Sequence, residues 1–74
     1  MYELYFRNNK GEDEFRCRTT TRQESMKFMI EELRLRGIKP YYCRTWEDGE
    51  GADMIDYGSH SSFYRIRKVE INNG

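Results

Sequence analysis

Residues 21–37 read TRQESMKFMIEELRLRG and predict one amphipathic helix against which the rest of the chain folds. The pattern Thr21-x-x-Glu24 is that of a capping box, in which each side chain can satisfy a free backbone N–H group at the start of a helix. Gly37 stands where a left-handed C-terminal cap is needed, and Pro40 prevents the helix from continuing soon afterwards. The helix is therefore expected to run to about Arg36.

One face of this helix is expected to seal one side of a small sheet. At about 100° per residue, this face has the apolar residues Met26, Met29, Ile30 and Leu33. Phe28 and Leu35 point the opposite way. Those two side chains are either covered by another part of the chain or exposed as a small contact surface.

Short runs of strand-forming residues flank the helix. Two runs precede it, at 2–7 and 14–18, and the Asn8-Asn9-Lys10-Gly11 stretch between them suits a tight turn. Three runs follow the helix, at 41–46, 54–57 and 63–71. The predicted order is β-β-α-β-β-β, an α+β fold with an antiparallel sheet and the helix packed across one face. Residues 1–74 are expected to form a single domain, and the last strand could instead extend beyond the sheet as an edge.

Composition limits the classes of function that suit this chain. It has 74 residues, of which 35% are charged, and its Lys plus Arg count of 13 equals its Asp plus Glu count. A neutral chain has no overall field that attracts nucleic acid or an anionic membrane, so any such contact must come from a local patch. The chain opens without a signal-peptide pattern and has no apolar run of membrane-spanning length. We expect a cytoplasmic protein with no membrane contact.

Catalytic and metal-binding motifs are not recognisable. Cys17 and Cys43 are too few for a disulfide framework and are expected to be reduced, although they could meet as a bridge. His60 lies among serines, but no nucleophile elbow or family-specific cysteine signature surrounds it, so its expected role is in a turn. The acidic loop at 47–53 does not match a calcium-binding loop, and zinc needs about four Cys or His ligands. No enzyme activity, metal or cofactor is expected.

Arginines alternate with aromatic residues along the predicted strands. If Leu4, Phe6, Phe15 and Cys17 face the helix, the opposite side of the first hairpin presents Tyr5, Arg7, Arg16 and Arg18. Arg44 and Trp46 share one side of the third strand, and Arg65 and Arg67 share one side of the last. The predicted binding face comprises Tyr5, Arg16, Arg18, Tyr42, Arg44, Trp46 and Arg65.

Several functions suit such a face. It could anchor a protein partner, because Tyr, Trp and Arg dominate interface hot spots, or it could bind single-stranded nucleic acid or RNA by stacking bases and neutralising phosphates. It could also be only a solvated sheet face on which Arg stems cover aromatic rings. Phe28 and Leu35 would be the natural interface of a homodimer or other self-associating structural protein. A non-enzymatic protein-binding module is the leading interpretation.

The second half of the chain also offers a resemblance. The stretches YYCRTW at 41–46 and DYGSHSSF at 56–63 resemble short uncharacterised proteins encoded by phages and prophages of Gram-positive bacteria. The similarity rests on no motif of known chemistry, so it implies no catalytic or binding residue. It does imply a context, because small phage proteins of this kind often bind and inhibit a host protein.

Overall fold

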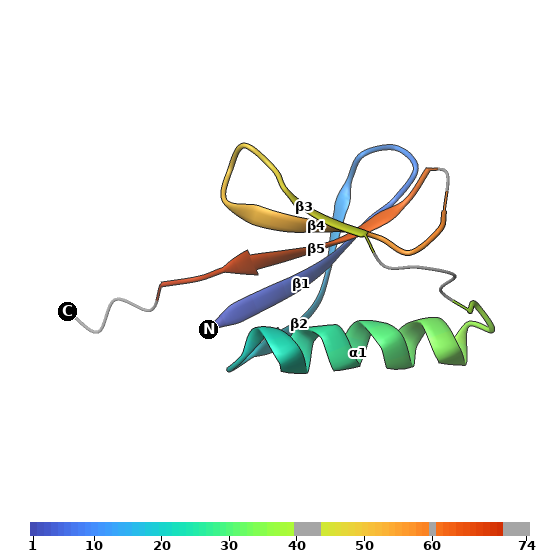
Figure 1. Cartoon of the computed structure of the whole chain (residues 1–74), viewed down its shortest axis with the longest axis horizontal. Helices are drawn as coiled ribbons and strands as arrows, with labels where there is room; N and C mark the ends of the chain where they lie inside the picture. Colours follow the sequence, from blue (N-terminus) through green and yellow to red (C-terminus); the bar gives the residue numbers. More distant parts are fainter. Residues whose placement is uncertain (40–43, 60, 71–74) are drawn as a thin grey trace.

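The computed structural model describes residues 1–39, 44–59 and 61–70 and shows the expected α+β fold (Figure 1). Five strands and one helix follow one another in the order β-β-α-β-β-β. Their bounds are β1 Tyr2–Arg7, β2 Asp13–Thr19, α1 Arg22–Leu35, β3 Arg44–Glu47, β4 Ala52–Asp56 and β5 Phe63–Lys68. Tyr42, Cys43 and His60 lie outside the described residues, so their predicted roles stay predictions.

The sheet is antiparallel throughout, with the strand order β2-β1-β5-β4-β3. The last strand, β5, pairs with β1 on one side and with β4 on the other, so the alternative of an edge position for it is wrong. This pairing joins the N-terminal hairpin to the three C-terminal strands. The edges of the sheet are β2 and β3.

Both ends of α1 are capped at the predicted residues, although the Glu24 carboxylate accepts from the Thr21 hydroxyl and not from the backbone N–H that a capping box requires. The Glu24 backbone N–H donates to the Thr21 hydroxyl at 3.2 Å, and that hydroxyl in turn donates to the Glu24 carboxylate at 3.1 Å. At the other end, the Ile38 N–H donates to the Leu33 carbonyl at 2.9 Å, and the Gly37 N–H donates to the Arg34 carbonyl at 3.0 Å. This is a Schellman motif, and Gly37 has the positive φ of 72° that it requires.

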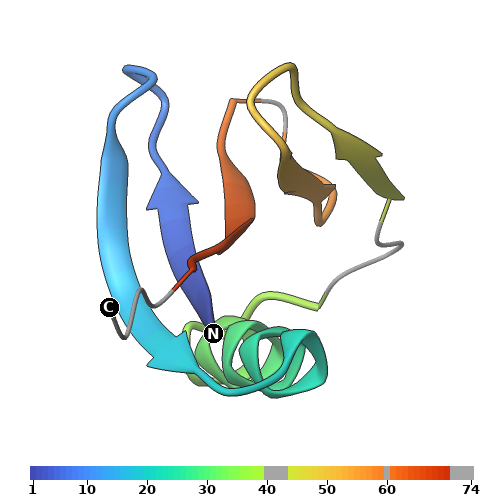
Figure 2. The same ribbon diagram turned by 90° about the vertical axis from the view of Figure 1, so that its left-hand side faces the viewer.

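The helix buries a narrower stripe than the sequence suggested. It lies across β2, β1 and β5 (Figure 2) and buries Ser25, Met29 and Leu33, which are four residues apart. Ile30 was expected on this face, but it is 47% exposed. Ser25 is also fully buried. Its hydroxyl is paired at 2.6 Å with that of Thr19, the last residue of β2.

Aromatic residues fill much of the core between the sheet and the helix. Tyr64 on β5 is at its centre, with the Phe6 ring 5.3 Å and the Tyr57 ring 5.4 Å away between centroids. The Tyr64 hydroxyl donates to the Glu32 carboxylate on α1, and burial together with this carboxylate raises the pKa of Tyr64. The complete cluster is Leu4, Phe6, Met29, Leu33, Ile55, Tyr57, Tyr64 and Ile66.

The buried stripe of α1 can be tested with two aspartate substitutions one residue apart. Met29→Asp places a charge in the core and is expected to destabilise the protein by roughly 4 kcal/mol or more, enough to unfold a domain this small. Ile30→Asp is the matched control, because Ile and Asp have similar helix propensities and position 30 is exposed; its cost is expected to stay below about 1 kcal/mol. Urea denaturation followed by circular dichroism measures both. Equal stabilities would contradict the helix face.

Candidate functional site

A β-bulge in the first hairpin decides which residues face away from the helix. Leu4 pairs with Cys17 and Tyr5 pairs with Phe15, which leaves Arg16 as an extra residue in β2. The extra residue reverses the alternation, so Phe15 joins Tyr5 on the sheet face that α1 does not cover. We call this side the open face. The prediction that Phe15 faces the helix is therefore wrong, whereas Leu4 and Phe6 are buried there and Cys17 packs against the core.

Arg16 belongs to the helix side of the sheet rather than to the predicted binding face. Its guanidinium carbon lies 5.2 Å from the centroid of the Phe6 ring, and its Nε is 2.9 Å from the Glu32 carboxylate on α1. These contacts join β2 to the helix. The assignment of Arg16 to the open face is thus corrected, and the cause is the bulge at this residue.

The open face has an aromatic pair near each edge of the sheet. Near the β2 edge, the Tyr5 and Phe15 rings meet edge to face with centroids 5.7 Å apart. Near the β3 edge, Trp46 and Phe63 meet in the same way at 5.6 Å. Phe15 is 55% exposed and Trp46 is 39% exposed, so both pairs present ring surface to solvent.

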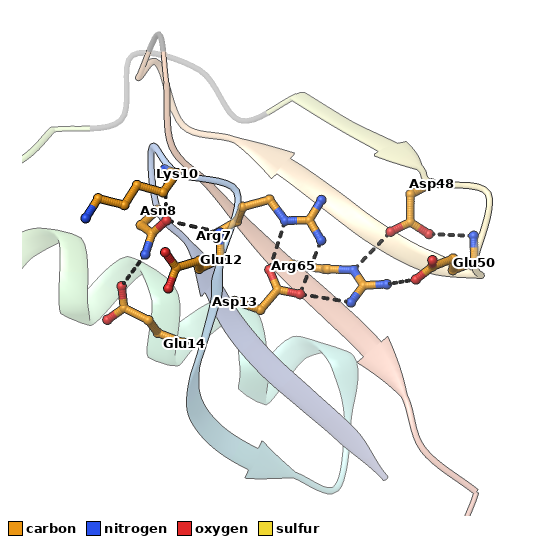
Figure 3. A network of polar contacts seen from close by, with 9 residues as sticks. All are labelled: Arg7, Asn8, Lys10, Glu12, Asp13, Glu14, Asp48, Glu50 and Arg65. Atoms are coloured by element: carbon orange, nitrogen blue, oxygen red, sulfur yellow. Dashed lines mark hydrogen bonds and ion pairs between the residues drawn. The ribbon is translucent and has the colours of Figure 1, made fainter.

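Arg65 lies between the two pairs, but it is buried and fully engaged within the chain (Figure 3). Its Nε donates to Asp48 at 3.0 Å, one terminal nitrogen donates to Asp13 at 3.1 Å, and the other donates to Glu50 at 2.8 Å. Only 7% of the residue is exposed. Its predicted place on the open face holds, but its guanidinium binds the chain itself and has little surface left for a partner.

The three carboxylates come from the two hairpin turns that flank Arg65, and both turns have the same pattern of side-chain to backbone hydrogen bonds. The Asn8 side-chain oxygen accepts the N–H groups of Lys10 and Glu12, and the Asp48 carboxylate accepts those of Glu50 and Ala52. The other Asp48 oxygen remains available to Arg65. The sequence signal for this arrangement is the repeated spacing of Asn8 to Gly11 and Asp48 to Gly51. The acidic loop at 47–53 therefore supplies internal counter-charges.

Two other arginines of the open face, Arg7 and Arg18, are paired as well. Arg7 binds Asp13 with two hydrogen bonds, at 2.9 and 3.2 Å, and Arg18 binds Glu3 at 2.7 Å. The bond from Arg7 lowers the pKa of Asp13, and the bond from Arg18 lowers the pKa of Glu3. The backbone N–H of Ala52 is the main cause that lowers the pKa of Asp48. The open face is thus close to electrically neutral over β1, β2 and β5.

A hollow of about 440 Å³ at the β3 edge is lined by Arg44, Trp46 and Asp56. Arg44 and Asp56 are direct cross-strand partners, and Phe63 lies next to the hollow, where its ring contacts that of Trp46. All four residues of β3 are exposed, and β4 is its partner in the sheet, so its outer edge has no strand beside it among the described residues. We call this group of Arg44, Trp46, Asp56 and Phe63 the Trp46 hollow.

The two predicted helix contacts are both on the surface. Phe28 is 42% exposed and Leu35 is 75% exposed. Their separation of seven residues places them on the same side of α1, about two turns apart. They form a small apolar contact area on the side of the molecule away from the open face.

The part of the chain that the structure describes also bears on metal binding, membrane spanning and cysteine reactivity. Its His, Cys, Asp and Glu side chains form no group of three or more that could hold a metal ion. No helix in it has both the length and the apolar character needed to cross a bilayer. Cys17 is a free thiol, and burial raises its pKa above the ordinary value, which makes it a poor nucleophile.

Removal of the Arg65 guanidinium should destabilise the fold. Arg65→Met keeps much of the apolar stem but leaves Asp13, Asp48 and Glu50 without their shared counter-charge, so a loss of roughly 2–4 kcal/mol is expected. Arg67→Met is the matched control on the same side of β5, where the side chain is exposed, and should cost less than about 1 kcal/mol. Urea denaturation of both variants measures the difference, and equal losses would contradict a structural role for Arg65.

Acid should also weaken the protein through the same carboxylates. Because folding lowers the pKa of Glu3, Asp13 and Asp48, their contribution is fully present above the ordinary carboxyl pKa of about 4 and is lost as the pH falls through the lower values of the folded state. Thermal midpoints should change little between pH 7 and 5 and then fall below about pH 4. In Arg65→Met the fall should be shallower but still present, because Arg7 and the Ala52 N–H remain. A midpoint that rises on acidification would contradict this assignment.

No protein-family model, curated protein or solved structure matches the chain. The resemblance to small phage proteins therefore stays a prediction. Function is argued below from the geometry of the open face, which Tyr5, Arg18, Arg44, Trp46 and Arg65 of the predicted residues share across the width of the sheet, and to which Arg16 does not belong.

Proposed function

We propose that this protein is a non-enzymatic protein-binding module that takes an extended segment of its partner along β3, with a partner side chain in the Trp46 hollow. The observation that supports this most directly is the outer edge of β3, which pairs with no strand of the described residues and lies beside an exposed Trp46. In strand addition, main-chain hydrogen bonds to a sheet edge supply affinity and an adjoining pocket supplies specificity. Both parts of that arrangement are present here.

The edge at β3 suits strand addition better than the edge at β2. The extra residue Arg16 interrupts the hydrogen-bond register of β2, and bulges of this kind protect edges from pairing. The pairing of β3 with β4 is regular, from Arg44 opposite Asp56 to Glu47 opposite Asp53. An incoming strand would therefore meet a straight ladder at β3 and an irregular one at β2.

The charges of the open face favour a protein over a nucleic acid. A nucleic-acid platform needs cations that are available to phosphates, and its affinity falls steeply with salt. Arg7, Arg18 and Arg65 are already paired with carboxylates of the chain. The Trp46 hollow offers aromatic rings together with an arginine, which are residue types enriched at protein interfaces, and its carboxylate, Asp56, would repel a phosphate. Binding of single-stranded nucleic acid or RNA is the alternative that the experiment below separates.

The partner class and location follow from the sequence. A bacterial host protein is the partner that the resemblance to phage proteins implies, and the bound protein could be inhibited by the contact. A cytoplasmic location is consistent with the free thiol of Cys17. Self-association through Phe28 and Leu35 is a second candidate, because both side chains are exposed on one side of α1.

The open-face proposal is tested by capture of partners from a Gram-positive bacterial lysate, with and without nuclease. Wild type is compared with Trp46→Ala and with Phe15→Ala, which removes the exposed ring at the other edge of the same face. We expect a nuclease-resistant protein to be retained by wild type and Phe15→Ala and lost with Trp46→Ala. Hydrogen exchange of the purified complex should then show new protection at the backbone amides of Arg44–Glu47.

Other outcomes would contradict the proposal in distinct ways. Equal loss in both variants, or in neither, would exclude the Trp46 hollow as the site. Capture that nuclease abolishes would replace the protein partner with a nucleic acid. Light scattering on wild type and Leu35→Glu tests the second candidate, since a monomeric wild type would exclude self-association.

A further inference from the structure

The loop between β4 and β5 contains a chain of three hydroxyl groups on the helix side of the sheet. The Tyr57 hydroxyl is 2.6 Å from that of Ser62, which is 2.9 Å from that of Ser59. Tyr57 is only 4% exposed and belongs to the core cluster, so its hydroxyl is held in a fixed place at the rim of the core. At the other end of this row of hydroxyl groups, the backbone of the loop holds the hydroxyl of Ser59 in place.

A count of protons and lone pairs shows that these three hydroxyl groups have one O–H donor without an acceptor among themselves. A hydroxyl group has one proton and can accept two hydrogen bonds. The Ser59 oxygen accepts the N–H groups of Ser61 at 3.3 Å and Ser62 at 3.2 Å, so it can contact the Ser62 oxygen only as a donor. Tyr57 and Ser62 then share one further bond. Whichever of them donates it, the proton of the other has no acceptor among the described residues.

The spare donor borders a hollow of about 330 Å³ whose other walls include two cations. The described residues that line it are Arg36, Ile38, Lys39, Tyr57, Gly58, Ser59 and Ser62. None of these lining residues is acidic. Arg36 is held in place with its guanidinium carbon 5.1 Å from the centroid of the Phe6 ring. The nearest carboxylate along the helix, Glu32, is already engaged by Tyr64 and Arg16.

We propose that this hollow binds a phosphate group. Two cations and a hydroxyl donor around one hollow suit a compact dianion with several acceptor oxygens. A carboxylate has one negative charge and two oxygens, so it would satisfy fewer of these groups. The site lies at the end of α1 where β4 turns into β5 (Figure 1), and the Trp46 hollow lies on the open face, so the two can be tested separately.

The test is a titration of isotope-labelled protein with inorganic phosphate, followed by NMR at pH 7.5 and constant ionic strength. We expect saturable shifts of the amides of Gly58, Ser59, Ser61 and Ser62. The triple variant Tyr57→Phe/Ser59→Ala/Ser62→Ala removes every hydroxyl of this group, because loss of Ser62 alone would free the proton of Ser59, and it should bind at least about ten-fold more weakly. Ser61→Ala is its control and should bind like wild type. Lys39→Gln should also weaken binding, whereas Lys68→Gln, on the last strand, should not.

Thermal melting of each variant establishes that it is folded before its affinity is compared. Acetate that binds as tightly as phosphate would overturn the choice of ligand. Shifts that do not saturate, or that persist unchanged in a folded triple variant, would overturn the site. Titration with a phosphoserine peptide then separates the two sources of the group: tighter binding than inorganic phosphate indicates a phosphorylated protein, and equal or weaker binding indicates a free small phosphate.

Discussion

The contact between Arg65 and its three carboxylates ties the two hairpin loops to the central strand of the sheet. Asp13 belongs to the N-terminal hairpin, Asp48 and Glu50 belong to the turn between β3 and β4, and Arg65 lies on the central strand β5. The backbone pairing of β1 with β5 sets the strand order, but it does not fix how the two hairpin loops lie against each other. A single guanidinium does so, because its planar fork of donors can engage groups from several directions at once.

This contact also explains how a chain of 74 residues covers both sides of its sheet. One helix is enough to cover one face only, and a domain of this size has little apolar surface to spare. On the open face, Ala52 and Met54 are nevertheless buried, directly opposite Arg67 and Arg65. Arginine stems can shield apolar neighbours of this kind from water, and the charged end of Arg65 meets Asp13, Asp48 and Glu50. The arginine and carboxylate side chains therefore form a thin second layer over part of the open face. The Trp46 hollow lies beyond this layer, at the β3 edge.

Local features of the sequence predicted the helix and the element order well. Thr21 and Gly37 act on backbone groups a few residues away, so their roles can be recognised without knowledge of the fold. The bulge at Arg16 could not be recognised in this way, because one extra residue leaves the alternating pattern of β2 intact and only shifts which side it faces. The role of Arg65 depends on carboxylates 15 to 52 residues away. Ile30 was misplaced because the buried stripe of α1 is formed by Ser25, Met29 and Leu33, and a polar residue such as Ser25 does not mark a buried stripe in the sequence.

The unequal edges of the sheet have a consequence for how copies of this protein can associate. Growth of a continuous sheet from molecule to molecule needs two edges that both accept a strand. Here one edge is interrupted at Arg16 and the other, at β3, is regular. Two molecules could pair through β3, but the pair would then end in interrupted edges on both sides. A small protein can in this way leave one sheet edge accessible to an added strand without assembling into a fibre.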